Sequence, residues 1–220
     1  MIAMSPNRTR VPTALWTELL LVASLVGLDV IARLMPHAPN FTPVAASALF
    51  AATVLRVRVL ALIVPFAAML LSDAVLGFYD WRVMSVVYVS ISLPALVGLL
   101  PSRFRAPLMV VLVLLSCSLT FFATTNFAVW AFSGMYAPNV EGLIKCYIAA
   151  LPFLQNTVAG DLFWATVLFG GFSLIQIREG TDQPRLIHGT AQAFAATTSS
   201  VARPASAVPP RARQAASRPS

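Results

Sequence analysis

Long apolar segments that almost lack charged residues constrain this chain more than any other feature. The segment from Pro107 to Trp130 carries no charge, and the segment from Val57 to Phe78 contains only Arg58 and Asp73. A helix needs about 20 mostly apolar residues to cross the hydrocarbon core of a bilayer. Segments of this kind therefore predict membrane-spanning helices.

The composition agrees with this prediction. Of the 220 residues 58% are hydrophobic and only 10% are charged, and the mean hydropathy is +0.80; soluble domains carry about 25% charged residues. The net charge of +7 comes from arginines scattered at the ends of apolar segments, not from a basic patch with interleaved aromatics, which argues against a nucleic-acid partner. Cys117 and Cys146 have no paired spacing and are predicted to be free, buried thiols. The sequence thus predicts an integral membrane protein with the lipid bilayer as its partner.

The fold class predicted is all-α, a polytopic bundle with about six transmembrane helices. A further apolar segment, Val140–Leu154, carries Glu141 and Lys145 and is interpreted as an interfacial or re-entrant helix. The second of the six spans is short for a crossing. The predicted spans are residues 13–34, 43–55, 57–78, 83–100, 107–130 and 158–177.

The basic residues predict the orientation, because Lys and Arg close to a span tend to stay in the cytoplasm. If the N-terminal segment 1–12 is inside, every basic residue except Arg33, Arg82 and Lys145 lies on the cytoplasmic side. This predicts a bacterial inner-membrane protein with both termini in the cytoplasm. Residues 180–220 are rich in Ala, Ser, Pro and Arg and are predicted to be a disordered basic tail.

In this orientation most of the other polar residues lie toward the outer face, in segments 36–43, 72–82 and 124–161. The prolines of the first segment restrict its backbone and would preorganise it. Polar outer loops combined with short cytoplasmic connections favour an outward-facing cup that binds a small molecule. The candidate binding residues are Asn40, Phe41, Thr42, Ser72, Asp73, Tyr79, Trp81, Asn126, Trp130, Asn156 and Asp161.

Simpler roles are open for several of these residues. Trp81 and Trp130 suit the aromatic belt of a membrane interface, Asn40 suits a helix cap, and Asp161 suits the first turn of the last span. Asp73 lies inside an apolar segment and is expected to face the bundle interior, either as a helix–helix contact or in the cup. The hydrogen-bond partners expected for it are Asn40, Thr42, Asn126 and Asn156.

The sequence contains no glycine-rich phosphate loop, no metal-ligand spacing and no nucleophile–base pattern. It therefore predicts a protein that is not an enzyme and that uses no metal or cofactor. Two functions of different classes remain open: transport of a small water-soluble metabolite, or a scaffold or assembly factor that docks a protein through its outer loops. A cavity under these loops would favour the first, and an exposed apolar outer patch would favour the second.

Four blocks of sequence resemble a family of bacterial six-span membrane proteins of unknown function, over about Leu34–Phe172. These are "LMPHAPNFTPVAASALFAATVL", "PFAAMLLSDAVLGFYDW", "TTNFAVWAFSGMYAP" and "CYIAALPFLQNTVAGDLFWATVLFGGF". More distantly, the layout is similar to the S-components of ECF-type vitamin transporters, in its six helices, its Thr-Pro-bearing first outer loop and its Gly-Asp turn before the last helix. That resemblance implies capture of a vitamin-like molecule through Asn40–Pro43, Ser72–Trp81 and Asn126–Asp161, with energising transporter subunits as partners.

Two features depart from the S-component pattern. The first helix of those proteins carries an Ala-x-x-x-Ala face for its energising partner, which only Ala23 and Gly27 approximate here. The solitary cobalamin-transporting relatives use an outer-loop cysteine as the cobalt ligand, where this chain has Tyr79 and Asp80. The substrate implied by the resemblance is therefore not specifically cobalamin.

Overall fold

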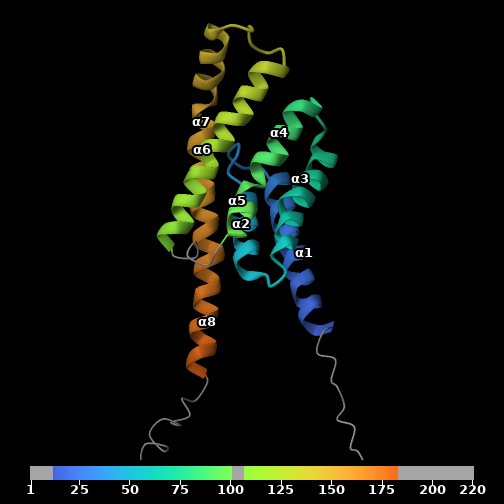
Figure 1. Ribbon diagram of the computed structural model, residues 1–220, viewed down its shortest axis with the longest axis vertical. Coiled ribbons are helices and arrows are strands. Elements are labelled where there is room, and N and C mark those ends of the chain that lie inside the picture. The colour runs from blue at the N-terminus through green and yellow to red at the C-terminus, as the bar shows by residue number, and fades with distance from the viewer. Residues whose placement is uncertain (1–11, 101–106, 183–220) are drawn as a thin grey trace, which may run out of the picture. The chain divides into compact units, whose positions relative to one another are not determined.

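The computed structural model describes residues 12–100 and 107–182, and each regular element in these ranges is a helix (Figure 1). The chain divides into two compact units after Gln176, and the cavity discussed below and the helices that line it belong to the first unit. In chain order the elements are α1 (Pro12–Leu34), α2 (Val44–Val54), the 3₁₀ helix η1 (Arg58–Leu62), α3 (Ile63–Leu76), α4 (Trp81–Ile91), α5 (Leu93–Gly98), α6 (Pro107–Phe132), α7 (Val140–Ala165), the π-helical segment η3 (Thr166–Gly170) and α8 (Gly171–Asp182).

Five helical stretches are long and apolar enough to cross a membrane, and α2 is a shorter apolar helix. The predicted all-α architecture with six apolar helices is therefore confirmed. Large apolar side chains such as Leu20, Val75 and Val89 are exposed on these helices, where they would contact lipid tails in a bilayer. The five stretches are Leu15–Leu34, Arg58–Leu76, Trp81–Gly98, Pro107–Phe132 and Val140–Gln176.

Helix α2 is the centre of the core. Its residues from Val44 to Ala52 are all buried, and α1, α3, α5, α7 and η1 pack around it. Its alanines make this possible, because small residues let neighbouring backbones approach closely. At Gly98 of α5, an added Cβ would lie 2.5 Å from the Cβ of Ala52. With 11 residues, α2 is shorter than a span and behaves as a buried core helix.

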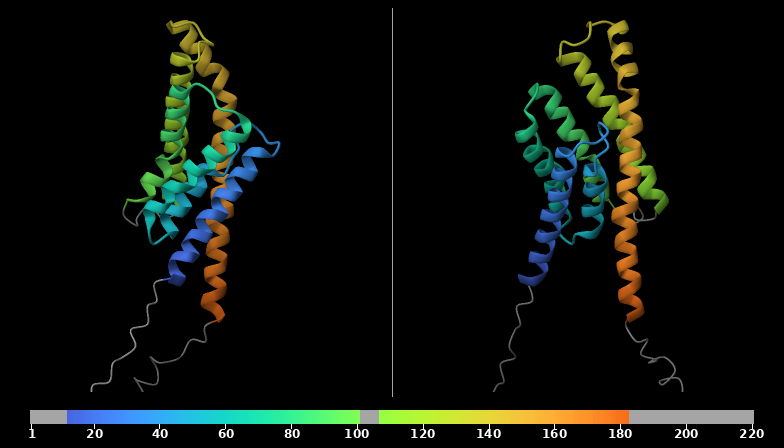
Figure 2. Two further views of the ribbon diagram at one scale, coloured as in Figure 1. Left: turned by 90° about the vertical axis from the view of Figure 1, so that its right-hand side faces the viewer. Right: turned by 180° about the vertical axis from the view of Figure 1, so that it is seen from behind.

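The chain reverses direction at the connections from α1 to α2, from α2 to α3, from α3 to α4 and from α6 to α7 (Figure 2). The connections after α1, α3 and α6 consequently lie toward one end of the unit, and the link between α2 and α3 lies toward the other (Figure 1). At that other end, the Glu18 carboxylate of α1 accepts hydrogen bonds from the backbone N–H groups of Arg56 and Val57, each at 3.2 Å. We call the end that carries the connections after α1, α3 and α6 the loop end.

The interpretation of Val140–Leu154 as a separate interfacial or re-entrant segment is wrong. Helix α7 runs without a break from Val140 to Ala165 and continues through η3 into α8, so the predicted span 158–177 is its second half. The apparent turn "LPFLQNTVAGD" is helical, because Pro152 is accommodated inside the helix and Gly160 has a packing role described below. The predicted outer loop 124–161 shrinks to the connection between Phe132 and Val140.

Both cysteines are free and buried, as predicted. Residues 180–182 of the predicted tail belong to α8, and residues 183–220 lie outside the described residues, as does the N-terminal segment 1–11.

Candidate functional site

A cavity of about 590 Å³ lies inside the first unit. Most of its walls come from the end of α1 with the loop that follows it, from α3 and α4, from α6 and from α7. The first residue of α2 and the connections before α4 and after α6 complete the lining. Its volume falls within the range of small-molecule sites, which is about 300–1,000 Å³. The site is therefore formed by connections at the loop end of the bundle and by the sides of its longest helices that face the bundle.

One face of α7 and one face of α6 form the longest walls. On α7 the lining residues recur every three or four positions, which places them in one stripe along the helix. On α6 the same spacing selects a second stripe with Phe121, Thr125 and Asn126. The α7 stripe consists of Cys146, Ala149, Ala150, Phe153, Leu154, Thr157 and Asp161.

The loop after α1 forms a third wall, and it packs tightly against α7. A Cβ added at Gly160 would lie 3.0 Å from the Cα of Phe41 and 3.2 Å from the backbone N of Thr42, so any other residue would require this loop to shift by a few tenths of an ångström. The Phe41 ring packs on that of Phe163, with centroids 5.7 Å apart. Asn40 has a φ of 65°, a left-handed conformation that asparagine tolerates better than most residues. The side chains of Asn40 and Thr42 line the cavity.

Arg33 lines the cavity from the last turn of α1, and it is held by a network of buried groups. Its Nη2 donates to Oδ1 of Asp73 at 2.6 Å, and its Nε donates to Oγ of Ser72 at 2.6 Å. The Tyr88 hydroxyl donates to Oδ2 of Asp73 at 3.1 Å. The Asp73 carboxylate, which is 2% exposed, is therefore neutralised by Arg33 and hydrogen-bonded on both oxygens.

Asp161 is the acid of the opposite wall, and its surroundings are sparser. It is 4% exposed, and its Oδ2 accepts from Oγ of Ser118 on α6 at 2.6 Å. The same Ser118 hydroxyl also lies 2.8 Å from the Leu114 carbonyl oxygen. A hydroxyl has one proton, so Ser118 can satisfy only one of these acceptors at a time.

A third buried acid, Asp29, lies one turn before Arg33 on α1. It is fully buried, and its Oδ1 accepts from the Ser47 hydroxyl of α2 at 2.8 Å. Its Oδ2 has no hydrogen-bond partner among the described residues. Asp29 links the first helix to the core helix and does not line the cavity.

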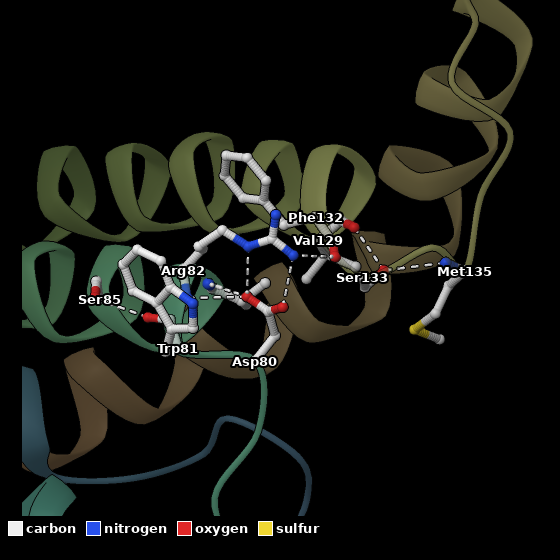
Figure 3. Close-up of polar contacts among 9 residues, drawn as sticks. Asp80, Trp81, Arg82, Ser85, Val129, Phe132, Ser133 and Met135 are labelled. Carbon is white, nitrogen blue, oxygen red and sulfur yellow. Dashed lines mark hydrogen bonds and ion pairs between the residues drawn. The ribbon is translucent and has the colours of Figure 1, made fainter.

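At the loop end, Asp80 fixes the start of α4 against the end of α6 (Figure 3). Its carboxylate caps α4 by accepting from the backbone N–H of Arg82, and it pairs with the Arg82 guanidinium at 2.8 Å. Arg82 in turn lies over the Phe132 ring, 5.0 Å from its centroid, and donates to the Phe132 carbonyl at 3.4 Å. The hydrogen bonds from Arg82 lower the pKa of Asp80 from 3.8 to about 2.

Tyr79, beside this contact, lines the cavity mouth from the short connection before α4. Partial burial of its side chain, together with the negative charge of Asp73, raises the pKa of its hydroxyl to about 12, and Arg33 opposes this shift. Tyr79 is therefore a neutral hydrogen-bonding group at ordinary pH.

The cavity brings together part of the predicted site. Of the predicted residues, Asn40, Thr42, Tyr79, Asn126 and Asp161 line it. Ser72 and Asp73 act one step behind, because they hold Arg33. The residues that do not line the cavity are Phe41, Trp81, Trp130 and Asn156.

Phe41 packs on Phe163, as described above, and the other three residues lie elsewhere for separate reasons. Trp81 is 73% exposed at the start of α4, and Asn156 lies off the lining stripe of α7, next to Thr157. The Trp130 indole donates to the Ala137 carbonyl at 3.0 Å and so holds the loop between α6 and α7. The alternative that placed Asp161 in the first turn of the last span is also wrong, because Asp161 lies inside the continuous helix α7.

The prediction that Asp73 faces the interior and is hydrogen-bonded is confirmed, but its expected partners are wrong. It binds Arg33 and Tyr88 in place of the outer-loop amides and threonine. Sequence reasoning counted Arg33 only as a charge at the end of a span. An arginine four residues after Asp29, within an apolar segment, was the signal for an interior role, because such residues rarely face lipid.

The fold and the cavity define a multi-pass membrane protein with a small-molecule-sized cavity in its helical bundle. Residues 13–184 match the model of a family of unknown function, DUF6580, and the chain belongs to that family. No curated protein and no solved structure matches the chain.

Proposed function

We propose that this protein binds a small water-soluble metabolite in the cavity and carries it across the membrane. The observation that supports this proposal is the cavity itself, which combines an apolar lining with a few polar groups from separate helices. Ligand sites usually have this composition, with polar groups that orient the ligand and apolar walls that enclose it. The alternative role as a scaffold gives no reason for such an internal space.

The proposed function involves no covalent chemistry. The thiol in the wall belongs to Cys146, and it donates to the backbone carbonyl of Asn126 at 3.4 Å instead of to a base. The His37 ring is engaged with the Met35 carbonyl oxygen at 2.6 Å. Both groups thus have local partners that suit a binding wall better than an acid–base pair.

Mass spectrometry of small molecules that co-purify with the detergent-solubilised protein tests this function. Ala149 lines the cavity and is exposed there, so Ala149→Trp should fill the space and eliminate the bound molecule. Ala131 on α6 is exposed and lies outside the cavity lining, so Ala131→Trp serves as the matched control and should retain the molecule. Equal retention of the molecule by both variants would contradict the proposal.

The orientation belongs to the same proposal, with the loop end facing outward and both termini in the cytoplasm. It rests on the distribution of basic residues described above. A reporter that is active only in the periplasm, fused after Ile177, should be inactive. Activity of this reporter would reverse the assignment of inside and outside.

The S-component resemblance extends the proposal to an energising partner. Ala23 is exposed on α1, and a Cβ added at Gly27 would meet nothing within 4 Å, so this small-residue face is not covered by the described residues. If a partner helix docks there, Gly27→Leu should abolish uptake in cells and leave ligand binding by the purified protein unchanged. Normal uptake by Gly27→Leu would remove this face from the proposal.

A further inference from the structure

We propose that the cavity takes an organic cation, a small molecule with a protonated amine, and that Asp161 is the residue that binds its charge. This inference rests on the proposed function, because it names the ligand class of the same cavity. It is drawn from the balance of charges in the walls. The balance differs sharply between the two sides of the cavity.

Among the described residues that line the cavity, Arg33 and Asp161 carry a formal charge, and His37 is a further titratable side chain. Arg33 is already neutralised, because the Asp73 carboxylate lies 2.6 Å from its Nη2. In the part of the chain that the structure describes, the ion pairs are Arg33–Asp73, Arg82–Asp80 and Lys145–Glu141, so Asp161 takes part in none. When Asp161 is ionised, the cavity therefore carries one negative charge without a counterion.

The hydrogen bonding of Asp161 leads to the same conclusion. A buried carboxylate has lone pairs for about four hydrogen bonds. Asp161 receives at most one, from a Ser118 hydroxyl that also lies near the Leu114 carbonyl, and its Oδ1 has no hydrogen-bond partner within residues 12–100 and 107–182. Buried charges in proteins are normally paired. A ligand N–H⁺ group at Oδ1 would supply the missing counterion and hydrogen bond together.

The rest of the lining fits the body of such a ligand. Phe121, Phe122 and Phe153 contribute apolar rings, and aromatic faces attract cations as well as apolar groups. Asn126 and Thr157 lie on the same two helical faces and add polar atoms. The wall thus combines one carboxylate, several rings and a few neutral polar groups.

An anion or a metal ion fits less well. An anion would have to compete with Asp73 for Arg33, and it would be repelled by Asp161 across the cavity and by Asp29 one turn from Arg33. A metal ion usually needs several ligands, and the described residues contain no group of three or more His, Cys, Asp or Glu side chains that could hold one. An organic cation needs only the single carboxylate.

The test compares amines with neutral and anionic analogues of the same shape. The probes are 2-phenylethylamine, 2-phenylethanol and phenylacetate, followed by smaller and larger alkyl sets of the same three types. Thermal unfolding in detergent detects binding, because a ligand of the folded state raises the unfolding temperature. We expect amines to stabilise the wild-type protein and the matched alcohols and carboxylates to have no effect.

Asp161→Asn keeps the size of the side chain and removes its charge. It should weaken amine binding at least about tenfold, the loss expected for one charge-assisted hydrogen bond. Asp80→Asn is the control acid, because Asp80 lies outside the cavity lining and should leave amine binding unchanged. Ser118→Ala keeps the Asp161 carboxylate and should preserve the preference for amines. If Asp161→Asn fails to fold, the comparison of amines with alcohols and carboxylates on the wild-type protein still tests the inference.

Several results would overturn the inference. Stabilisation by alcohols or carboxylates but not amines would do so, as would equal amine binding by wild type and Asp161→Asn, or loss of the amine preference in Ser118→Ala. A neutral or anionic molecule that co-purifies with the wild type would reject the cation and leave the proposed transport function standing. If no probe of any type binds and no small molecule co-purifies, the proposed function itself fails.

Discussion

The two acids beside the cavity, Asp73 on α3 and Asp161 on α7, are equally buried but differently satisfied. Asp73 has a guanidinium within 2.6 Å and a tyrosine hydroxyl on its second oxygen. Asp161 has a single serine hydroxyl that lies near a second acceptor. The comparison teaches that burial alone does not show whether an acid is held by the fold, whereas the inventory of its hydrogen-bond and ion-pair partners does.

The same substitution at both positions tests this distinction, and the largest effect is expected at Asp73. Asp73→Asn leaves the Arg33 charge in the bundle without its counterion. Breaking a buried ion pair costs about 3–5 kcal/mol, and the partial exposure of Arg33 places this case near about 3 kcal/mol. Thermal or denaturant unfolding in detergent measures the loss.

Two further variants control this prediction. Tyr88→Phe removes only a neutral donor to Asp73 and should cost about 1 kcal/mol. The double variant Arg33→Met with Asp73→Leu removes both charges and should recover much of the stability that Asp73→Asn loses. If Asp73→Asn were as stable as Tyr88→Phe, the pair would not be the structural element that we describe.

The next largest effect is expected at Gly160, which joins the Asp161 side of the cavity to the first loop. Gly160→Ala would push a Cβ against the backbone of Phe41 and Thr42, and overpacking of this kind costs about 1–3 kcal/mol. The measurement is again unfolding in detergent, together with binding of the amine probe. We expect both the unfolding temperature and the affinity for the amine probe to fall, because the loop after α1, which lines the cavity, must move away from α7.

Gly27→Ala on α1 is the matched control for Gly160→Ala on α7. Its added Cβ meets nothing within 4 Å, so it should stabilise α1 by about 0.5–1 kcal/mol through a lower backbone entropy cost. Equal stabilities of the two alanine variants would show that the close packing of the first loop on α7 contributes little.

A smaller effect is expected for Asp161→Asn in the absence of ligand. This substitution removes a charge that has no counterion and keeps an acceptor for Ser118, so the unfolding free energy should change by less than about 1 kcal/mol. Ser118→Ala should lower the unfolding free energy more than Asp161→Asn does, because it takes away the one hydrogen-bond donor to Asp161 among the described residues. A large loss in Asp161→Asn would mean that Asp161, like Asp73, is structural, and the comparison would fail.

The smallest effect is expected from Asp80 at the loop end, and it depends on pH. Its pKa is lowered to about 2 by Arg82, so its contribution is present above its ordinary value of 3.8 and disappears as the pH falls toward about 2. The difference in unfolding temperature between wild type and Asp80→Asn should therefore be present at pH 6 and vanish near pH 2. A difference that grows on acidification would contradict the assigned ion pair.

The sequence alone determined the class of this protein and most of its helices. Long apolar segments without charges predict helices whatever the tertiary packing, because few other backbone structures are stable in a bilayer. The first five predicted spans lie within a few residues of the observed helices, and the free buried cysteines follow from the same pattern. Asn40, Thr42, Tyr79, Asn126 and Asp161 were also identifiable, since polar residues near the ends of or within apolar segments rarely face lipid.

Only the tertiary structure decided which of these polar groups meet. Arg33 and Asp73 are separated by 40 positions in the chain and pair because α1 packs against α3. The continuity of α7 fixes the side on which each residue lies, so that Thr157 and Asp161 line the cavity and Asn156 does not. Helix rotation and packing are set by the sum of many contacts across the bundle, which no local pattern encodes. For that reason the sequence could mark the acids, but only the packed helices could give Asp73 a counterion and leave Asp161 without one among the described residues.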